Sequence, residues 1–256
     1  MNKHRHALIR LGLAIATVLA LPTASPAQVK VIISGGFAAA FQEMLPEFEK
    51  TTGITVTMAT GPSQGNGPNT IGAQLRRGVP ADVVILSREG LDELIAEGRI
   101  VARSDVDLAQ TPLGMAVRAG LPKPDISTVD AFKQTLLRAK SITFTGSTTG
   151  IYMTTKLFPQ LGIAREISGK LRITDVPVPS GESELAIQPV SELLHVPGFN
   201  FVGPIPVEIQ YLSVFTAALV AGSKEPEAAK RLITSLSSEN AKAAIRKSGM
   251  EPSKSR

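Results

Sequence analysis

Short apolar runs rich in β-branched residues alternate with amphipathic segments along this chain of 256 residues. Residues 29–34 (VKVIIS) and 81–86 (ADVVIL) are two such runs, and their composition is typical of strands buried on both faces of a sheet. Between them, residues 37–50 carry apolar side chains at helical spacing, and residues 54–60 alternate as a strand. This order predicts an α/β fold in which helices cover a mostly parallel sheet.

The same alternation continues to the end of the chain. We expect further helices at residues 88–98, 128–138 (with Ser127 as N-cap), 151–161, 226–236 and 240–248, and further strands at residues 113–118, 141–145, 186–190 and 211–220. The number of predicted strands and helices is too large for a single five-stranded sheet. Two α/β lobes are the simplest arrangement that contains all of them. We therefore predict a first lobe of residues 28–112 and 214–256, a second lobe of residues 113–213, and two crossing strands between them.

The beginning of the chain has the three parts of a secretory signal peptide. Residues 1–10 include basic side chains, and residues 11–21 (LGLAIATVLAL) are apolar throughout. Small residues then precede a predicted cleavage after Ala27. An apolar run of this length is too short to span a bilayer. We therefore expect residues 1–27 to be removed, and the mature protein to work in the periplasm as a monomer without a stable membrane anchor.

The composition excludes several kinds of chemistry. The chain has no Cys, which excludes disulfides, thiol nucleophiles and thiolate metal sites. His195 is the only histidine after residue 27, so a multi-histidine zinc site is excluded as well. The formal charge of +5 includes three positive charges within residues 1–27, and the remaining +2 does not favour nucleic acid as a partner. We expect no metal and no cofactor.

Small polar residues follow several of the predicted strands. They occur in Ser34-Gly35-Gly36, in residues 61–67 (GPSQGNG), at Ser87 and in residues 145–150 (TGSTTG). Ligands of open parallel sheets bind beyond the carboxyl ends of the strands, where helix N-termini present free N–H groups. Glycine allows the backbone to approach a ligand closely, and Ser or Thr adds hydroxyl donors. The sequence therefore predicts a cleft that binds a small anion.

Three segments resemble a known protein family. Residues 29–65 (VKVIISGGFAAAFQEMLPEFEKTTGITVTMATGPSQG), 76–87 (RRGVPADVVILS) and 237–252 (SSENAKAAIRKSGMEP) are similar to the type II periplasmic solute-binding proteins of the molybdate-binding branch. The resemblance covers essentially all of the chain after residue 27. It implies two α/β lobes joined by two crossover strands, an anionic ligand in the cleft between them, and an ABC-type permease as a partner.

The resemblance also implies which residues hold the ligand. The family uses a serine after each of the first two strands, main-chain groups of the second lobe and a tyrosine. The first two positions correspond to Ser34 and Ser63, whereas the tyrosine position falls near Ser191, where this chain has no tyrosine. Together with the turn residues, the expected ligand-binding set is Ser34, Gly35, Gly36, Ser63, Gln64, Ser87, Gly146, Ser147, Thr148 and Ser191.

Two functions remain open from the sequence. The first, which we favour at this point, is a binding protein for a small anion, either a polycarboxylate such as aconitate or an oxyanion such as molybdate. The alternative rests on the Ser-Gly-Gly-Phe turn, the enlarged loop 61–68, Ser87 and residues 181–194 (GESELAIQPVSELL), which resemble a sub-branch that includes periplasmic aconitate isomerase. The resemblance then implies interconversion of trans- and cis-aconitate by allylic proton transfer. Tyr152 is a candidate acid or base, because it lies near the N-terminus of the helix that follows residues 145–150, where the positive helix end favours an ionised phenol.

Overall fold

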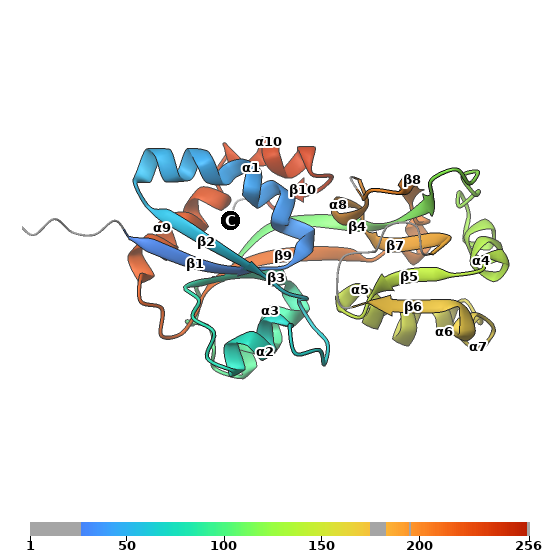
Figure 1. Cartoon of the computed structure of the whole chain (residues 1–256), viewed down its shortest axis with the longest axis horizontal. Coiled ribbons are helices and arrows are strands. Elements are labelled where there is room, and N and C mark those ends of the chain that lie inside the picture. Colours follow the sequence, from blue (N-terminus) through green and yellow to red (C-terminus); the bar gives the residue numbers. More distant parts are fainter. Residues whose placement is uncertain (1–26, 175–182, 195, 255–256) are drawn as a thin grey trace, which may run out of the picture.

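The computed structural model describes residues 27–174, 183–194 and 196–254. The predicted signal peptide, apart from Ala27, and His195 lie outside these residues. Figure 1 shows two lobes side by side, with long strands running from one into the other. None of the helices formed by the described residues has the length and apolar character that crossing a membrane requires.

The first lobe begins with the predicted alternation of strands and helices. Its elements are β1 (Gln28–Ile33), α1 (Gly35–Thr52), β2 (Thr55–Thr60), α2 (Ile71–Arg76), β3 (Val83–Ser87) and α3 (Arg88–Ala96). β1 lies between β2 and β3 and pairs with both in parallel, as the near-continuous apolar composition of β1 and β3 predicts. Pro46 lies inside α1 without dividing it. The carboxyl ends of these three parallel strands therefore meet at one edge of the sheet.

Two long strands connect the lobes. β4 (Val106–Arg118) pairs with β9 (Leu212–Leu219) through its first half, and with β7 (Leu185–Pro189) and β8 (Phe199–Pro204) through its second half. β9 continues into the first sheet, where it lies antiparallel to β3. The whole sheet has the order β2-β1-β3-β9-β4-β7-β5-β6, and β8 and the short β10 (Glu251–Pro252) pair with β4 beside this path. The chain thus passes between the two groups of elements twice, along β4 and along β9.

The second lobe is built from shorter elements. They are α4 (Val129–Arg138), β5 (Ile142–Thr145), α5 (Thr148–Tyr152), a π-helical turn (Met153–Leu157), α6 (Phe158–Gln160), α7 (Ala164–Ile167), β6 (Leu171–Thr174), β7, α8 (Val190–Leu193), β8 and 3₁₀ turns at Ser168–Lys170 and Val207–Ile209. β5 pairs in parallel with β6 and with β7. The chain then returns through β9 to the first lobe, where α9 (Pro226–Leu236) and α10 (Ala241–Lys247) end it.

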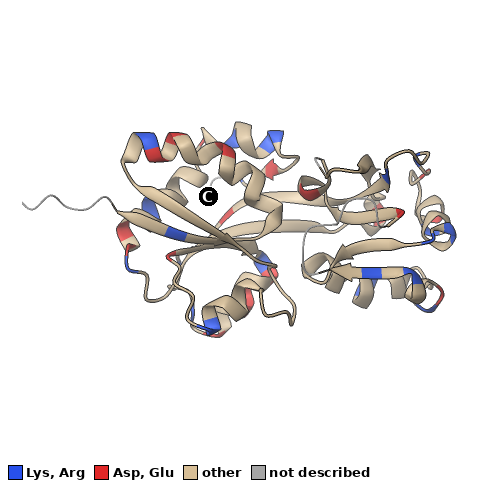
Figure 2. Cartoon of the chain, viewed as in Figure 1, with Lys and Arg blue, Asp and Glu red and all other residues tan. Residues whose placement is uncertain are grey.

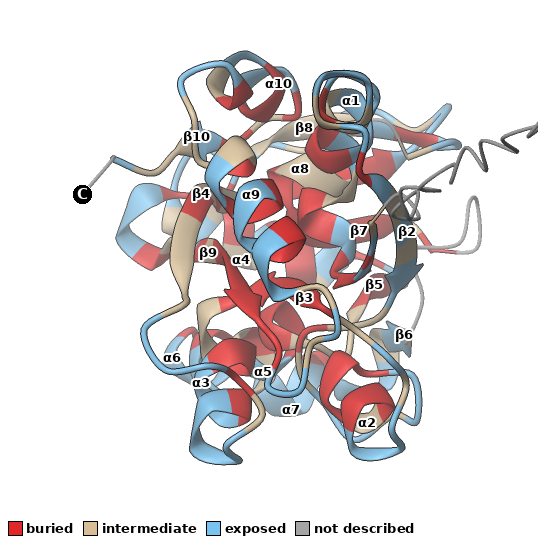
Figure 3. Cartoon of the chain, turned by 90° about the vertical axis from the view of Figure 1, so that its left-hand side faces the viewer, coloured by how far each residue is buried: buried red, intermediate tan, exposed pale blue. Residues whose placement is uncertain are grey.

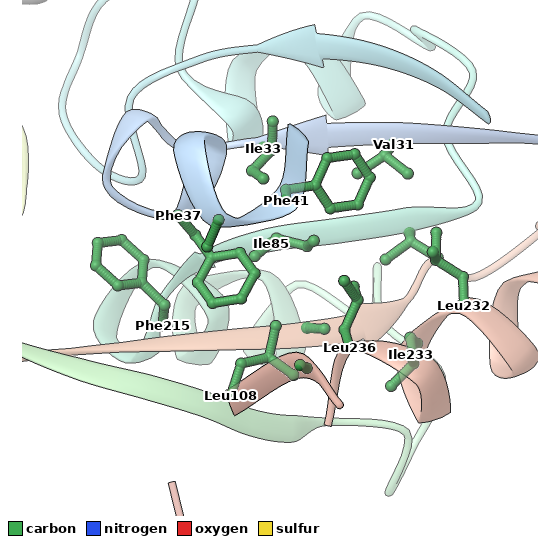
Figure 4. Close-up of a cluster of buried hydrophobic side chains, with 14 of the residues drawn as sticks. Val31, Ile33, Phe37, Phe41, Ile85, Leu108, Phe215, Leu232, Ile233 and Leu236 are labelled. Atoms are coloured by element: carbon green, nitrogen blue, oxygen red, sulfur yellow. The ribbon is translucent and has the colours of Figure 1, made fainter. Parts of the chain in front are cut away.

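Buried apolar side chains form separate cores in the two lobes. In the first lobe, Phe37 and Phe41 of α1 belong to one cluster with Ile33 of β1, Ile85 of β3 and Leu232 of α9 (Figure 4). A smaller cluster around Ile71 and Leu91 fills the opposite face of the same sheet. Figure 3 shows the outcome, with central strands buried and helices exposed on their outer sides. All residues of these two clusters fall within 28–112 and 214–256.

The cores of the second lobe lie within residues 113–213. The larger one gathers around Phe132, Phe144 and Phe158, and a smaller one contains Leu193 and Phe199. This partition accords with the predicted lobe limits, which remain a prediction at the level of single residues. We refer to the two parts as lobe 1 and lobe 2.

Two local predictions need correction. Thr128, not Ser127, is the N-cap of α4, because its hydroxyl accepts the N–H of Ala131. The helix expected at residues 151–161 begins earlier, with α5 at Thr148, and it passes through the π-helical turn before α6. This earlier start brings the N-terminus of α5 directly after β5.

Candidate functional site

A cavity of about 420 Å³ lies where the strand ends of the two lobes face each other. Among the described residues, its lining consists of Ser34, Gly35, Ala38, Thr60, Gly61, Pro62, Ser63, Asn69, Ser87, Thr145, Ser147, Thr148, Thr149, Pro189, Glu192, Ser213 and Phe215. Both lobes and the β9 crossing contribute to this lining. The polar turns that the sequence singles out after separate strands are thus brought together.

The lining includes six of the ten residues expected to bind a ligand, namely Ser34, Gly35, Ser63, Ser87, Ser147 and Thr148. The remaining four, Gly36, Gln64, Gly146 and Ser191, are not part of it. Gly36 packs against Phe215, which is part of the cavity lining, and a methyl group at Gly36 would lie 2.0 Å from Cζ of this ring. Ser191 is next to the cavity residue Glu192, and its Oγ is buried without a hydrogen-bond partner among the described residues.

Tyr152 lies on the lobe 2 helix but is not part of the cavity lining. Its hydroxyl donates to the carbonyl oxygen of Ile209 at 3.0 Å, and its ring stacks on Tyr211 with 4.7 Å between the centroids. Burial raises the pKa of Tyr152. A phenol that is already bonded and is disfavoured as an anion is a weak candidate for proton transfer.

Two helices present their N-termini to the cavity. Gly35 opens α1 in lobe 1, and Thr148 and Thr149 open α5 in lobe 2. The side chains of the residues before these helices, Ser34 and Ser147, do not cap their own helix N–H groups. Free N–H groups and the partial positive charge at helix N-termini favour an anion. The cavity therefore has anion-binding character on both sides.

Hydrogen bonds fix the direction of several hydroxyl groups. The Ser63 Oγ accepts the N–H of Ser87 at 2.9 Å, and the Ser147 Oγ accepts the N–H of Gln64 at 3.1 Å. Neither hydroxyl is seen to donate to another of the described residues, so its proton is available to a ligand. Because both residues line the cavity, Ser63 and Ser147 can donate to a ligand from opposite lobes.

No Lys or Arg belongs to the described cavity lining, and Glu192 is its only ionisable residue. Glu192 lies in α8, and burial raises the pKa of its carboxyl to about 7. A carboxyl with such a pKa can exchange a proton with a ligand near neutral pH. Figure 2 shows that charged residues otherwise gather on the outer helices and loops.

Glu192 is not among the residues that the sequence predicts for the site. The residue stands in a helix of four residues, which is too short to show a periodic pattern. A glutamate in such a context usually lies in solvent. The one available signal was its place directly after β7, at the same kind of strand end that carries the predicted polar turns.

The described residues contain no group of three or more His, Cys, Asp or Glu side chains placed to hold a metal ion. The described lining supplies hydroxyls, amide groups, helix N-termini and the carboxyl of Glu192.

Comparison with known proteins gives consistent likenesses. The model of the family described as bacterial extracellular solute-binding protein matches residues 29–251. An aconitate isomerase of a Pseudomonas species is 39% identical over 250 residues, which cover 95% of each chain.

Solved structures share the arrangement of the chain at low identity. The periplasmic molybdate-binding protein of Azotobacter vinelandii has a TM-score of 0.70 at 18% identity, covering 87% of this chain and 98% of that one. A sulfate-binding protein of Mycobacterium tuberculosis has a TM-score of 0.65 at 17% identity, covering 88% of this chain and 87% of that one. At such identities the likeness concerns the fold alone.

Proposed function

The chain belongs to the bacterial extracellular solute-binding protein family and has the type II periplasmic binding-protein fold, and we propose that its cavity binds the tricarboxylate aconitate. We further propose that the protein interconverts the trans and cis isomers of this ligand. The observation that carries this proposal is Glu192, a carboxyl with a raised pKa in a cavity otherwise lined by neutral groups. The name of the 39% identical relative supports the choice of substrate.

The reaction needs a group that both removes and returns a proton. Ionised Glu192 takes a proton from the methylene carbon of aconitate, and the C–H electron pair moves into the neighbouring allylic system. The double bond shifts by one position, and the carboxyl returns a proton to the carbon at the other end. One C–H bond breaks and one forms, so the product is an aconitate again and no oxidant or reductant is required. The pKa near 7 suits both halves of this exchange.

The rest of the cavity suits a substrate with several negative charges. The hydroxyls of Ser63 and Ser147 and the N–H groups at the N-termini of α1 and α5 provide donors from both lobes. Such donors hold carboxylates, and they also stabilise the charge that develops on the substrate when the proton leaves. A cavity of about 420 Å³ accommodates a molecule of this size.

Binding without turnover is the second candidate. It is favoured by one observation, namely that the polar groups of the described lining other than Glu192 are neutral, which suits an anion of fixed charge. In that function the protein would deliver its ligand to an ABC-type permease. Both candidates place the protein in the periplasm, after removal of residues 1–27.

The decisive experiment follows trans-aconitate by proton NMR after adding the protein without residues 1–27. We expect cis-aconitate to appear until the two isomers reach a constant ratio, and the same ratio to result when cis-aconitate is the starting material. Absence of turnover would exclude the isomerase. Calorimetry with trans-aconitate, citrate, molybdate and sulfate would then identify the class of ligand that the binding protein takes.

A further inference from the structure

Gln64 connects the two lobes through both its backbone and its side chain. It belongs to the lobe 1 loop that follows β2, and its N–H donates to the Ser147 Oγ of lobe 2 at 3.1 Å. Its Oε1 accepts the hydroxyl proton of Thr148, also in lobe 2, at 2.8 Å. The next residue, Gly65, has a φ of +112°, and a methyl group there would lie 3.1 Å from the carbonyl oxygen of Gly146. The absence of a side chain thus allows the two backbones to approach closely at this point.

The network around Gln64 has a single consistent direction. Its Nε2 donates to Oε1 of Glu93, on the exposed side of α3, at 2.6 Å. A carboxylate can only accept, so Glu93 fixes the amide with Oε1 turned toward Thr148. Thr148 thereby donates its single hydroxyl proton to Oε1 of Gln64. The 2.8 Å contact between Thr148 Oγ1 and Ser87 Oγ then requires Ser87 to donate.

The direction of these bonds separates two kinds of hydroxyl in the cavity. Ser87 and Thr148 donate their hydroxyl protons in hydrogen bonds that connect the lobes. The hydroxyls of Ser63 and Ser147 accept bonds from described residues and can donate their protons to a ligand. A residue that closes the lobes thus also determines which hydroxyls can donate to a ligand. Glu93 orients Gln64 without lining the cavity, because it is not among the described residues of the lining.

We propose that Gln64, oriented by Glu93, is a positioning residue that holds the two lobes together through protein–protein hydrogen bonds and thereby sets the balance between the open and closed arrangements. Its partners Ser147, Thr148 and Glu93 are protein groups, so these bonds do not require a ligand to form. Binding then requires less reorganisation, because part of the closure has already taken place. Release requires these bonds to break, so the same residue slows the departure of the ligand.

The expected effects follow from the number of bonds that each variant removes. Gln64→Ala removes the side-chain bond to Thr148 that crosses between the lobes, besides the bond to Glu93 within lobe 1. It should shift the open-to-closed ratio about 3- to 10-fold toward open, as expected for the loss of one hydrogen bond. Glu93→Ala should shift it in the same direction by a smaller factor. Glu93→Gln keeps an oxygen that accepts from Gln64 and should restore the original ratio. Gln42→Ala, on the exposed face of α1, is the matched control and should change nothing.

The test measures the distance between the lobes directly. Because the chain has no cysteine, Glu47→Cys and Lys156→Cys can carry spin labels on exposed positions of lobe 1 and lobe 2, and pulsed electron resonance gives their distance distribution. Without ligand, we expect the parent protein to give mainly the shorter distance, and Gln64→Ala and Glu93→Ala to add a longer one. Identical distributions in the parent and Gln64→Ala, or a Glu93→Gln variant that opens as far as Glu93→Ala, would overturn the proposal.

This measurement is independent of turnover. If the protein binds without isomerising, the distances still report on Gln64, and a failure of the proposed function does not affect the result. A second readout uses the ligand that calorimetry or NMR identifies. Gln64→Ala should weaken its apparent affinity about 3- to 10-fold and accelerate its dissociation, whereas a change in the melting temperature without either effect would indicate a purely structural role.

Discussion

The carboxyl of Glu192 in lobe 2 faces Gly35 of lobe 1, so that a methyl group at Gly35 would lie 3.7 Å from both Cδ and Oε1 of the glutamate. Gly35 is the first residue of the 18-residue helix α1. The glutamate thus lies beside the N-terminus of a long helix, whose partial positive charge opposes the effect of burial on the ionised form. The effect of burial is the larger of the two, and it raises the pKa of Glu192 to about 7.

Replacing the carboxyl with an amide tests its role in proton transfer. Glu192→Gln should lower the turnover of trans-aconitate by about 10²- to 10⁴-fold, the range that general acid–base catalysis contributes. Binding of aconitate, measured by calorimetry, should be retained or become tighter, because the amide removes a negative charge from the cavity. Glu166→Gln, on the exposed face of α7, is the control. Turnover that survives in Glu192→Gln would remove this residue from the mechanism.

The raised pKa of Glu192 predicts opposite pH dependences for stability and activity. In the unfolded chain this pKa is near 4.5, so between that value and about 7 the folded protein binds the additional proton. Stability should therefore fall as the pH rises through this window, by at most about 3 to 4 kcal/mol at about 1.4 kcal/mol per pKa unit. The value of kcat/KM should rise through a pH of about 7, since only the ionised carboxyl accepts a proton.

Thermal unfolding of the parent protein and Glu192→Gln at pH 5 and pH 8 measures the stability effect. The amide variant should gain stability relative to the parent between these two conditions. An equal difference at both pH values would show that the ionisation of Glu192 does not affect folding.

The two free hydroxyl protons predict a matched pair of binding variants. Ser63→Ala and Ser147→Ala should each weaken binding of the anionic ligand by about 1–3 kcal/mol, because each leaves the bound charge one donor short. Ser63→Ala should also lower the melting temperature, since the N–H of Ser87 loses its acceptor in a buried position. Calorimetry and thermal unfolding separate the two effects. Unchanged affinity in both variants would mean that the ligand does not bind between these hydroxyls.

The environment of Tyr152 predicts a small catalytic effect. Tyr152→Phe removes the hydrogen bond to the carbonyl of Ile209 but keeps the ring that stacks on Tyr211. Turnover should stay within about 5-fold of the parent, well below the range of a general acid or base. A loss of 10²-fold or more at unchanged affinity would restore the catalytic role that the sequence suggests for this tyrosine.

Two neighbouring glycines predict opposite sensitivities to substitution. A methyl group at Gly36 would overlap the ring of Phe215, which is buried in the core of lobe 1. Gly36→Ala should therefore reduce stability by about 1–3 kcal/mol, the usual effect of overpacking. Gly35→Ala meets only ordinary contacts with Glu192 and should fold normally while obstructing the cavity. Denaturant unfolding tests the first statement and calorimetry the second.

The sequence predicts the large elements well because hydrophobic period and length agree in them. β1, β3, α1 and α9 have long enough patterns to be recognised at nearly their observed bounds. β6 and α8 contain four residues each, too few to show a period, and neither was predicted, although β5, which has the same length, was. The first half of β4 was missed because Asp107, Gln110 and Pro112 interrupt its apolar character.

The candidate site divides in a similar way. The polar turns were recognisable, since strand ends in a parallel sheet meet at one edge whatever the details of packing. Which hydroxyls donate to a ligand was not recognisable, because the contact between Ser87 and Thr148 joins residues that are distant in sequence and belong to different lobes. Glu192 was missed for a related reason, since its raised pKa depends on burial by elements that sequence patterns do not bring together.

The two long strands that connect the lobes have a consequence for the order in which the chain folds. The core of lobe 1 combines Phe37 near the beginning of the described chain with Leu232 and Met250 near its end. A chain that emerges from its N-terminus cannot complete this core until almost the last residue is present, whereas the cores of lobe 2 lie within one continuous stretch. Lobe 2 can therefore assemble first, and the core of lobe 1 stays incomplete until α9 and α10 are present.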